Sequence, residues 1–256
     1  AIATVISQCI SASLVLRCMV KDTGPLHLDL KKMRLHPQAM RQILRIGLPA
    51  GFQGILFSLS NVVIQSSVNI FGNIVVAGNS AAANLEGFVY MAMNAFYQTT
   101  LSFVSQNYGA GEQKRIHRIV LLGEACVIVT GTLLGNAVVF FGNELLHIYS
   151  SNPEVIAAGI VRLHYISMVY ALCGIMDVMV GALRGIGYSV MPMIVSIVGV
   201  CVLRLVWLAT VFQIPEYHRI ETVYLSYPVT WILTSLVYIV FFIWVRVRTC
   251  RKSAAA

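Results

Sequence analysis

Charged residues are scarce in this 256-residue chain: Asp, Glu, Lys and Arg make up 11% of it, whereas 58% is hydrophobic and the mean hydropathy is +0.79. A soluble domain usually carries about 25% charged residues. The composition therefore excludes an ordinary soluble protein. Because the apolar runs are far longer than the ~10 residues of a barrel strand, we predict an all-α integral membrane protein lying in a lipid bilayer.

Metal-binding and disulfide motifs are missing as well. The six cysteines and six histidines are scattered, and no two cysteines form a C-x-x-C pair, so neither a zinc site nor a disulfide framework is predicted. Paired acids, a His cluster or a Ser/His pair at membrane depth are not recognisable either. We therefore expect no enzyme activity, no metal and no cofactor.

The first residues are apolar, and their positive charge, Arg17, comes at the end. A signal peptide has the reverse order and closes on small residues. We interpret this stretch as the end of a preceding transmembrane helix, followed by a basic, amphipathic linker on the membrane surface that ends where Pro49 opens the next span. The expected divisions are 1–20 (helix end), 21–45 (basic linker), 46–248 (six-helix lobe) and 249–256 (cytoplasmic tail).

Six apolar stretches after the linker are long enough to cross a bilayer, which takes roughly 20 helical residues. Asn152-Pro153-Glu154 marks the start of one of them, with a capping Asn, a first-turn Pro and an adjacent acid. The expected spans are about 46–72, 80–107, 116–141, 154–183, 190–213 and 223–246.

The distribution of basic residues explains the net charge of +8. Fifteen of the eighteen Lys and Arg residues lie in alternate connections and at the C-terminus, which predicts that these segments are cytoplasmic. Nucleic-acid binding is not needed to account for the charge. The segments predicted to be cytoplasmic are 21–45, 108–118, 184–189 and the C-terminus.

Amide side chains recur at four-residue spacing in the first two expected spans, at Asn61 and Gln65 and again at Asn94 and Gln98. This spacing puts them on one face of a helix. A polar stripe in a lipid-length helix must face protein or water. Hydrogen bonding between helices accounts for any single amide, but two adjacent stripes together favour a polar cavity.

Three motifs resemble those of the multidrug and toxic compound extrusion (MATE) family, in the second half of such a transporter. They are Leu48-Pro-Ala-Gly51, Ser105-Gln-Asn-Tyr-Gly-Ala-Gly111 and Gly181-Ala-Leu-Arg-Gly-Ile-Gly-Tyr-Ser189. We expect structural roles for the motif residues Pro49, Gln106, Asn107, Gly109, Gly111, Arg184 and Gly185.

The resemblance implies a twelve-helix protein of the cell membrane, in bacteria the inner membrane, in which two six-helix lobes surround a cleft and export bulky organic cations against a sodium or proton gradient. A first six-helix lobe would then be the partner of this one. The NorM-like branch has a carboxylate near the position of Leu56–Ser58, but no acid occurs here between Asp29 and Glu86. The chain thus resembles the DinF-like branch, and the coupling ion, H⁺ or Na⁺, stays open.

Asp177 is the acid within the fourth span, seven residues or about 10 Å from Arg184 at the cytoplasmic end. It is either a cation or proton site or an acid held at the interface, since a charge in lipid costs roughly 2.5–3.5 kcal/mol. Arg204 differs from it in depth, so a partner elsewhere is favoured. We expect Glu124 to be a structural acid and Glu86 to lie near the outer edge of its span.

Aromatic and thioether side chains could offer adaptable contacts to hydrophobic cations, although most such residues in a span simply pack. With the polar candidates, they define the expected cleft. Its residues are Asp177, Asn61, Gln65, Asn94, Gln98, Tyr90, Tyr97, Phe57 and Met176.

We expect an antiporter lobe that exports organic cations by alternating access. An exporter or flippase of a lipid-linked or endogenous metabolite is the first alternative. Its cleft would be expected to carry several basic residues for a pyrophosphate group, whereas Arg204 is the one basic residue that we expect deep in a span. A truncated half-transporter without function is the second alternative. An intramembrane enzyme is disfavoured.

Overall fold

The computed structural model describes residues 2–22, 24, 27–29 and 34–254. These residues form helices and no strand, in two compact units, 1–44 and 45–256. The first unit contains α1 (Ile2–Lys21) and the beginning of α2 (Pro37–Asn69). The central part of the predicted basic linker, which includes Lys31 and Lys32, lies outside the described residues. The helix α2 already begins at Pro37, before the expected start of the span at residue 46, and Pro49, which was expected to open the span, lies inside the helix.

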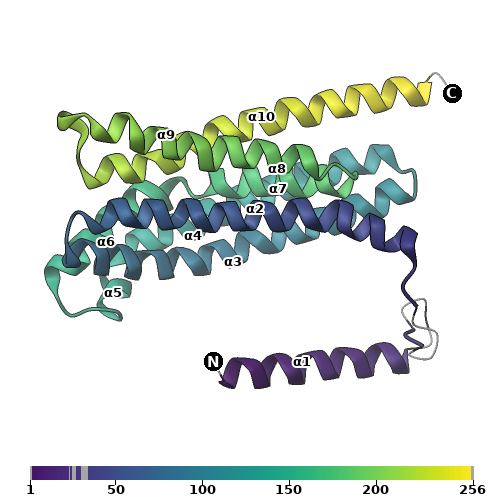
Figure 1. The fold of residues 1–256 in the computed structure, drawn as a ribbon, viewed down its shortest axis with the longest axis horizontal. Helices are drawn as coiled ribbons and strands as arrows, with labels where there is room; N and C mark the ends of the chain where they lie inside the picture. Colours follow the sequence, from purple (N-terminus) through teal and green to yellow (C-terminus); the bar gives the residue numbers. More distant parts are fainter. Residues whose placement is uncertain (1, 23, 25–26, 30–33, 255–256) are drawn as a thin grey trace. The chain divides into compact units, whose positions relative to one another are not determined.

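The second unit is a bundle of long helices that run beside one another and are joined by short turns (Figure 1). It begins with the greater part of α2. After α2 come α3 (Asn73–Gly109), α4 (Gln113–Phe140), the short α5 (Gly142–His147), α6 (Pro153–Ile166), α7 (Ala171–Gly185), α8 (Val190–Ser196), α9 (Leu203–Ala209) and α10 (Ile220–Ala254).

Among the described residues, five helical segments are long and apolar enough to cross a membrane, or six if the bent α6–α7 pair counts as one span. The 37-residue α3 is not one of them, because its amides and Glu86 lower its hydropathy. It packs against α4, α6 and α7. The expected spans 46–72 and 80–107 leave residues 73–79 as a loop, but this expectation is wrong, because the helix starts at Asn73 and these residues form its first turns.

The predicted span at 154–183 is broken in the middle. Asn152 caps α6 as expected, accepting a hydrogen bond from the Glu154 backbone N–H at 2.9 Å. The helix then gives way to a 3₁₀ turn, η2 (Ser167–Val169), and α7 continues at an angle of 47°. α4 approaches this break closely, since a Cβ on Gly135 would collide with the carbonyl oxygen of Ser167.

The span after α7 is irregular too. α8 passes into a π-helical segment, η3 (Ile197–Val202), and then into α9 and a 3₁₀ turn, η4 (Val211–Gln213). A single π turn in a membrane helix shifts the register of all following side chains. It thereby sets the direction of Arg204, which is discussed below.

Glycines form the turns of the second and third family motifs. Gly111 and Gly187 adopt φ of +77° and +92°, a region that favours glycine. The Asn107 side chain donates to the Phe103 carbonyl at 2.8 Å, and the Gln106 side chain donates to Ser102 Oγ at 3.3 Å, so both bond within the last turns of α3. Gly185 is buried, and a Cβ there would lie 2.7 Å from Val104 Cγ1. It therefore permits close packing of α7 on α3.

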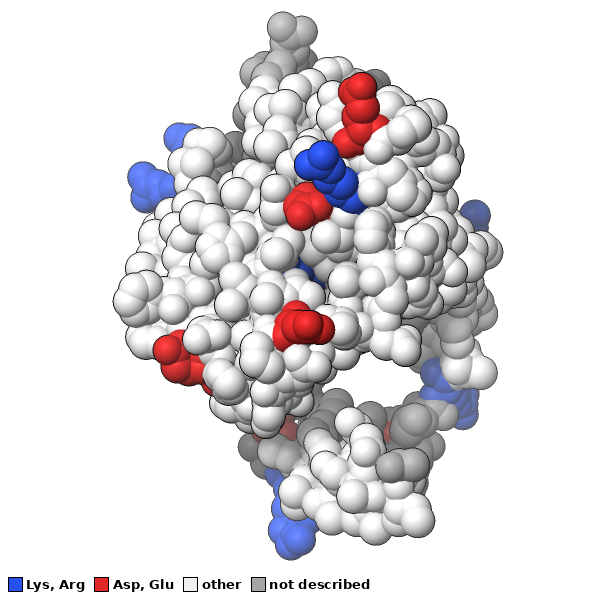
Figure 2. Space-filling view, turned by 90° about the vertical axis from the view of Figure 1, so that its left-hand side faces the viewer, with Lys and Arg blue, Asp and Glu red and all other residues white. Residues whose placement is uncertain are grey.

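Figure 2 views the end of the bundle that carries the α2–α3 turn, α5 and the α9–α10 connection. This face is mostly uncharged, and its few charged groups are mainly acidic. Three of the helices that begin here have an acid in the first turn, namely Glu144 in α5, Glu154 in α6 and Glu221 in α10. Acids at helix N-termini are favourable because they face the positive end of the helix dipole.

Candidate functional site

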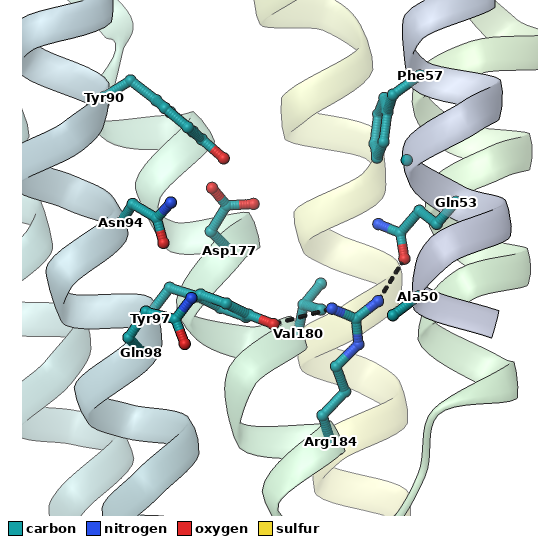
Figure 3. A pocket seen from close by; sticks show the side chains of 11 residues that line it. Ala50, Gln53, Phe57, Tyr90, Asn94, Tyr97, Gln98, Asp177, Val180 and Arg184 are labelled. Atoms are coloured by element: carbon teal, nitrogen blue, oxygen red, sulfur yellow. Dashed lines mark hydrogen bonds between the residues drawn. The ribbon is translucent and has the colours of Figure 1, made fainter. Parts of the chain in front are cut away.

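A cavity of about 210 Å³ lies between α2, α3 and α7, and we call it the Asp177 cavity (Figure 3). Residues spaced three or four apart on each helix point into it, as expected for one face of a helix. α2 contributes Ala50, Gln53, Gly54 and Phe57, α3 contributes Tyr90, Asn94, Tyr97 and Gln98, and α7 contributes Asp177, Val180 and Arg184.

Hydrogen bonds from Arg184 link α7 to the other two helices that line this cavity. Its Nη1 donates to Tyr97 Oη at 2.8 Å and its Nη2 donates to Gln53 Oε1 at 2.7 Å, as Figure 3 shows. The Nε atom is buried and has no partner among the described residues. Arg184 was predicted only as a motif residue and Gln53 was missed; the spacing of Gln53, one turn before Phe57, was the available signal.

The polar chain continues from the cavity into the neighbouring helices. Gln53 Nε2 donates to Ser196 Oγ at 2.9 Å, and Ser196 shares a hydrogen bond with the Tyr238 hydroxyl. Tyr238 Oη also contacts the Pro192 carbonyl at 2.7 Å. The position of Arg184 is therefore fixed through α2 to α8 and α10.

Asp177 is partly buried, and its carboxylate points into the cavity, where the hydroxyl end of Tyr90 faces it (Figure 3). No described residue donates a hydrogen bond to this carboxylate, whereas two acceptors occupy Arg184. An acid without a hydrogen-bond donor in a membrane interior is costly. The arrangement suits a cation or a proton that completes the site.

A second cavity, of about 270 Å³, lies between α2, α3, α6 and α10, and we call it the Arg162 cavity. Asn61 and Gln65 line this cavity and not the first one. The expectation that both amide stripes face one cavity is thus wrong. α2 and α3 are antiparallel, so the turns that follow Phe57 on α2 lie level with the turns that precede Tyr90 on α3.

A buried ion pair forms one wall of the Arg162 cavity. Arg162 donates to both carboxylate oxygens of Glu86, from Nε at 3.0 Å and from Nη2 at 2.6 Å. Its Nη1 donates to Asn79 Oδ1 at 2.7 Å. Glu86 is 4% exposed and is thus buried between helices; its predicted place near the outer edge of a span stays a prediction. Arg162, which the sequence analysis did not weigh, was detectable as a basic residue inside the fourth span.

The remaining candidates lie outside the two cavities. Arg204 donates to Thr230 Oγ1 at 3.0 Å and lies 4.0 Å above the Tyr227 ring, which confirms a partner other than Asp177. Met176 is buried in the hydrophobic core, so its placement in the cleft is wrong. Both carboxylate oxygens of Glu124 are buried without a hydrogen-bond partner among the described residues. Its structural role stays a prediction.

The comparisons with known proteins agree on one family. The profile of the family described as MatE matches residues 49–210. The chain is 29% identical over 162 residues to "Probable multidrug resistance protein YpnP" of Bacillus subtilis, which covers 63% of this chain and 36% of YpnP. It is 27% identical over 128 residues to a protein named "FAD transporter" from Shewanella oneidensis, covering 50% of this chain and 28% of that protein.

Solved structures give the same result for the fold. The crystal structure of a mutant of the Vibrio cholerae MATE transporter VcmN is similar with a TM-score of 0.81 and 19% identity, over 98% of this chain and 55% of that one. The chain spans about half, or less, of the length of the relatives it matches. The resemblance to a branch within the family stays a prediction. The family itself is shown, because the match covers more than half of the chain: this protein belongs to the MatE family of multi-pass membrane proteins.

Proposed function

We propose that the chain is one lobe of a secondary active exporter for organic cations, working by alternating access together with another six-helix lobe. The observation that carries this proposal is the Asp177 carboxylate, which faces a cavity and receives no hydrogen bond from the described residues. Asn94 Oδ1 is likewise buried without a partner among them, so a second acceptor is available beside the acid.

The coupling ion is H⁺ or Na⁺, and it competes with the organic cation for Asp177. Two cations cannot share one carboxylate in a small cavity without strong mutual repulsion. Binding of one therefore releases the other, which is the linkage that an antiporter needs. Tyr90 and Phe57 give the cavity aromatic surface beside the acid, a combination that attracts organic ammonium groups.

The test is equilibrium binding of tetraethylammonium, a small organic cation, to the purified chain. Asp177→Asn keeps the size of the side chain and removes its charge, so affinity is expected to fall about tenfold or more, which corresponds to ~1.4 kcal/mol or more. Glu154→Gln, in the exposed first turn of α6, is the matched control and is expected to bind as the unaltered chain does.

Equal binding by the Asp177→Asn and Glu154→Gln variants would remove Asp177 from the cation site. Addition of Na⁺ at constant ionic strength, and separately a drop in pH, identifies the competitor. The ion that couples is the one that weakens tetraethylammonium binding to the unaltered chain but not to the Asp177→Asn variant.

A second candidate is export of an endogenous metabolite that carries an anionic group. Arg184 has a buried Nε without a described partner and lies in the same cavity as Asp177. The protein named "FAD transporter" is among the relatives. The sequence argument against this candidate, that Arg204 alone lies deep, is weakened because Arg162 is also buried within a span. Competition by inorganic phosphate for binding of an anionic probe, lost in Arg184→Gln, would favour it.

A further inference from the structure

We propose that the Arg162 cavity is a second ligand subsite, and that it binds an uncharged aromatic ring. This inference rests on the proposed function in one respect, namely that the Asp177 cavity binds the cationic group of the same ligand. The substrates would then be molecules with a cationic head and a flat aromatic part. The binding of the ring stands on the geometry of this cavity alone.

The charges in the cavity are already paired, so they leave no site for an ion. Arg162 uses Nε and Nη2 on Glu86 and Nη1 on Asn79, and Tyr224 Oη contacts the same Asn79 oxygen at 3.2 Å. The guanidinium also lies 5.6 Å from the centre of the Tyr227 ring. A ligand cation would be repelled by Arg162, and a ligand anion would be repelled by Glu86. An uncharged group avoids both costs.

Three aromatic rings, those of Tyr170, Tyr227 and Trp231, also line the cavity. Tyr170 and Trp231 have ring centres 5.5 Å apart at 62°, and Tyr227 and Trp231 have ring centres 5.8 Å apart at 75°. The inclined rings make a corner in which a flat ligand can stack on one ring and meet the edge of the next. Tyr170 and Trp231 are 9% and 5% exposed, so such contacts would be shielded from water.

Asn61 supplies the polar group that can orient a ligand. Its carboxamide lines the cavity and makes no hydrogen bond with another described residue. Gln65 is already engaged, accepting from Asn79 at 3.1 Å and donating to Asn69 at 3.0 Å. Asn61 can therefore bond a ring nitrogen or a carbonyl oxygen of the ligand.

The two cavities occupy successive turns of the same helices. Asn61 follows Phe57 by one turn on α2, and Glu86 precedes Tyr90 by one turn on α3. Four residues rise about 6 Å along a helix. A ligand that reaches both cavities therefore has its cationic group about 6–10 Å from its ring.

The experiment uses acridine, kept uncharged at alkaline pH, as the aromatic probe and Trp231 as the reporter. Trp207→Phe and Trp244→Phe remove the other two tryptophans of the chain, neither of which lines the cavity. Acridine is expected to quench Trp231 fluorescence with the same saturation curve that equilibrium dialysis gives. Asn61→Leu is expected to weaken acridine binding about tenfold. Trp231→Leu, made in the chain that keeps its other two tryptophans and measured by equilibrium dialysis, is expected to weaken it to the same extent.

Asp177→Asn is expected to leave acridine affinity unchanged within about twofold, because the ring does not contact Asp177. Absence of saturable acridine binding, or binding that leaves Trp231 fluorescence unchanged, overturns the subsite. Tetraethylammonium binding, measured on the same samples, separates the two proposals. If that binding is insensitive to Asp177→Asn while acridine still quenches Trp231, the cation site fails and the aromatic subsite stands.

Discussion

At the scale of single residues, the site depends on which polar groups the protein itself satisfies. Arg184 uses both of its Nη atoms on Tyr97 and Gln53, whereas Asp177 receives no donor from the described residues. The cavity therefore contains one negative and one positive side chain, but the carboxylate of Asp177 is free to bind a ligand, whereas the guanidinium of Arg184 is largely hydrogen-bonded within the protein. A cation finds a free carboxylate, whereas the one charged donor group left for an anion among the lining residues is the buried Nε of Arg184. This inequality is the reason to rank cations first.

The Glu86–Arg162 pair yields a prediction about stability. Arg162→Met leaves Glu86 buried beside apolar groups, and the loss of one partner of a buried ion pair costs about 3–5 kcal/mol. The double variant Glu86→Gln with Arg162→Met removes the unpaired charge and is expected to recover much of that loss. Thermal unfolding in detergent measures both. A double variant no more stable than Arg162→Met alone would show that the charge is not the cause.

The sequence predicted those features of the site that depend on spacing within a single helix. The position of Asp177 within a span and the common face of Tyr90, Asn94 and Gln98 followed from helical spacing, and the structure places these residues in one cavity. The Glu86–Arg162 pair joins residues 76 apart in the chain, so no local pattern specifies it. It emerges only when α3 packs on α6.

At the scale of elements, α3 shows how polarity and position are connected. It is the long helix with too many polar residues to qualify as a membrane span by composition, and it packs against α4, α6 and α7. Hydropathy predicted the existence of the helices, but not the bend between α6 and α7 or the π turn after α8. At the bend, α4 approaches the chain closely through Gly135 and Ser167, a contact between helices that hydropathy does not report.

The contact of α7 with α3 can be tested by adding one methyl group. Gly185→Ala puts a Cβ 2.7 Å from Val104 Cγ1, so it is expected to destabilise the protein by about 1–3 kcal/mol. Gly109→Ala is the control, because nothing lies within 4 Å of a Cβ there. Denaturant titration in mixed micelles compares the two variants. Recovery of stability by Val104→Ala in the Gly185→Ala background is expected, and equal stability of both single variants would refute the close-packing account.

At the scale of the whole molecule, the distribution of the basic residues predicts one orientation in the membrane. Glu112 lies in a connection that is predicted to be cytoplasmic, and Glu216 lies in the connection between α9 and α10 at the other end. Lys and Arg favour the cytoplasmic side. The bundle should therefore expose these two sites to opposite compartments.

Labelling with a membrane-impermeant maleimide checks this orientation. In a background with the native cysteines replaced, Glu216→Cys is expected to react in intact cells. Glu112→Cys is expected to react only after the membrane is opened. The reverse pattern would place the basic connections outside and contradict the predicted topology.

The chain spans about half the length of the transporter structure it resembles, so transport is expected to need a second lobe. A cleft between two lobes can open alternately to either side, whereas a single lobe provides one wall. On this expectation, the two cavities lie in one wall of the transport cleft. On the proposed function, ligand binding is tested on the chain alone, whereas export is expected to need the second lobe.

The most direct measurement is therefore efflux of tetraethylammonium from pump-deficient cells that produce either this chain or the chain with its reading frame extended upstream, each with and without Asp177→Asn. We predict export by the extended protein only, loss of export with Asp177→Asn, and dependence on either the sodium or the proton gradient when each is collapsed separately. An extended protein that inserts in the membrane but exports equally with Asp177→Asn, or does not export at all, would contradict the account.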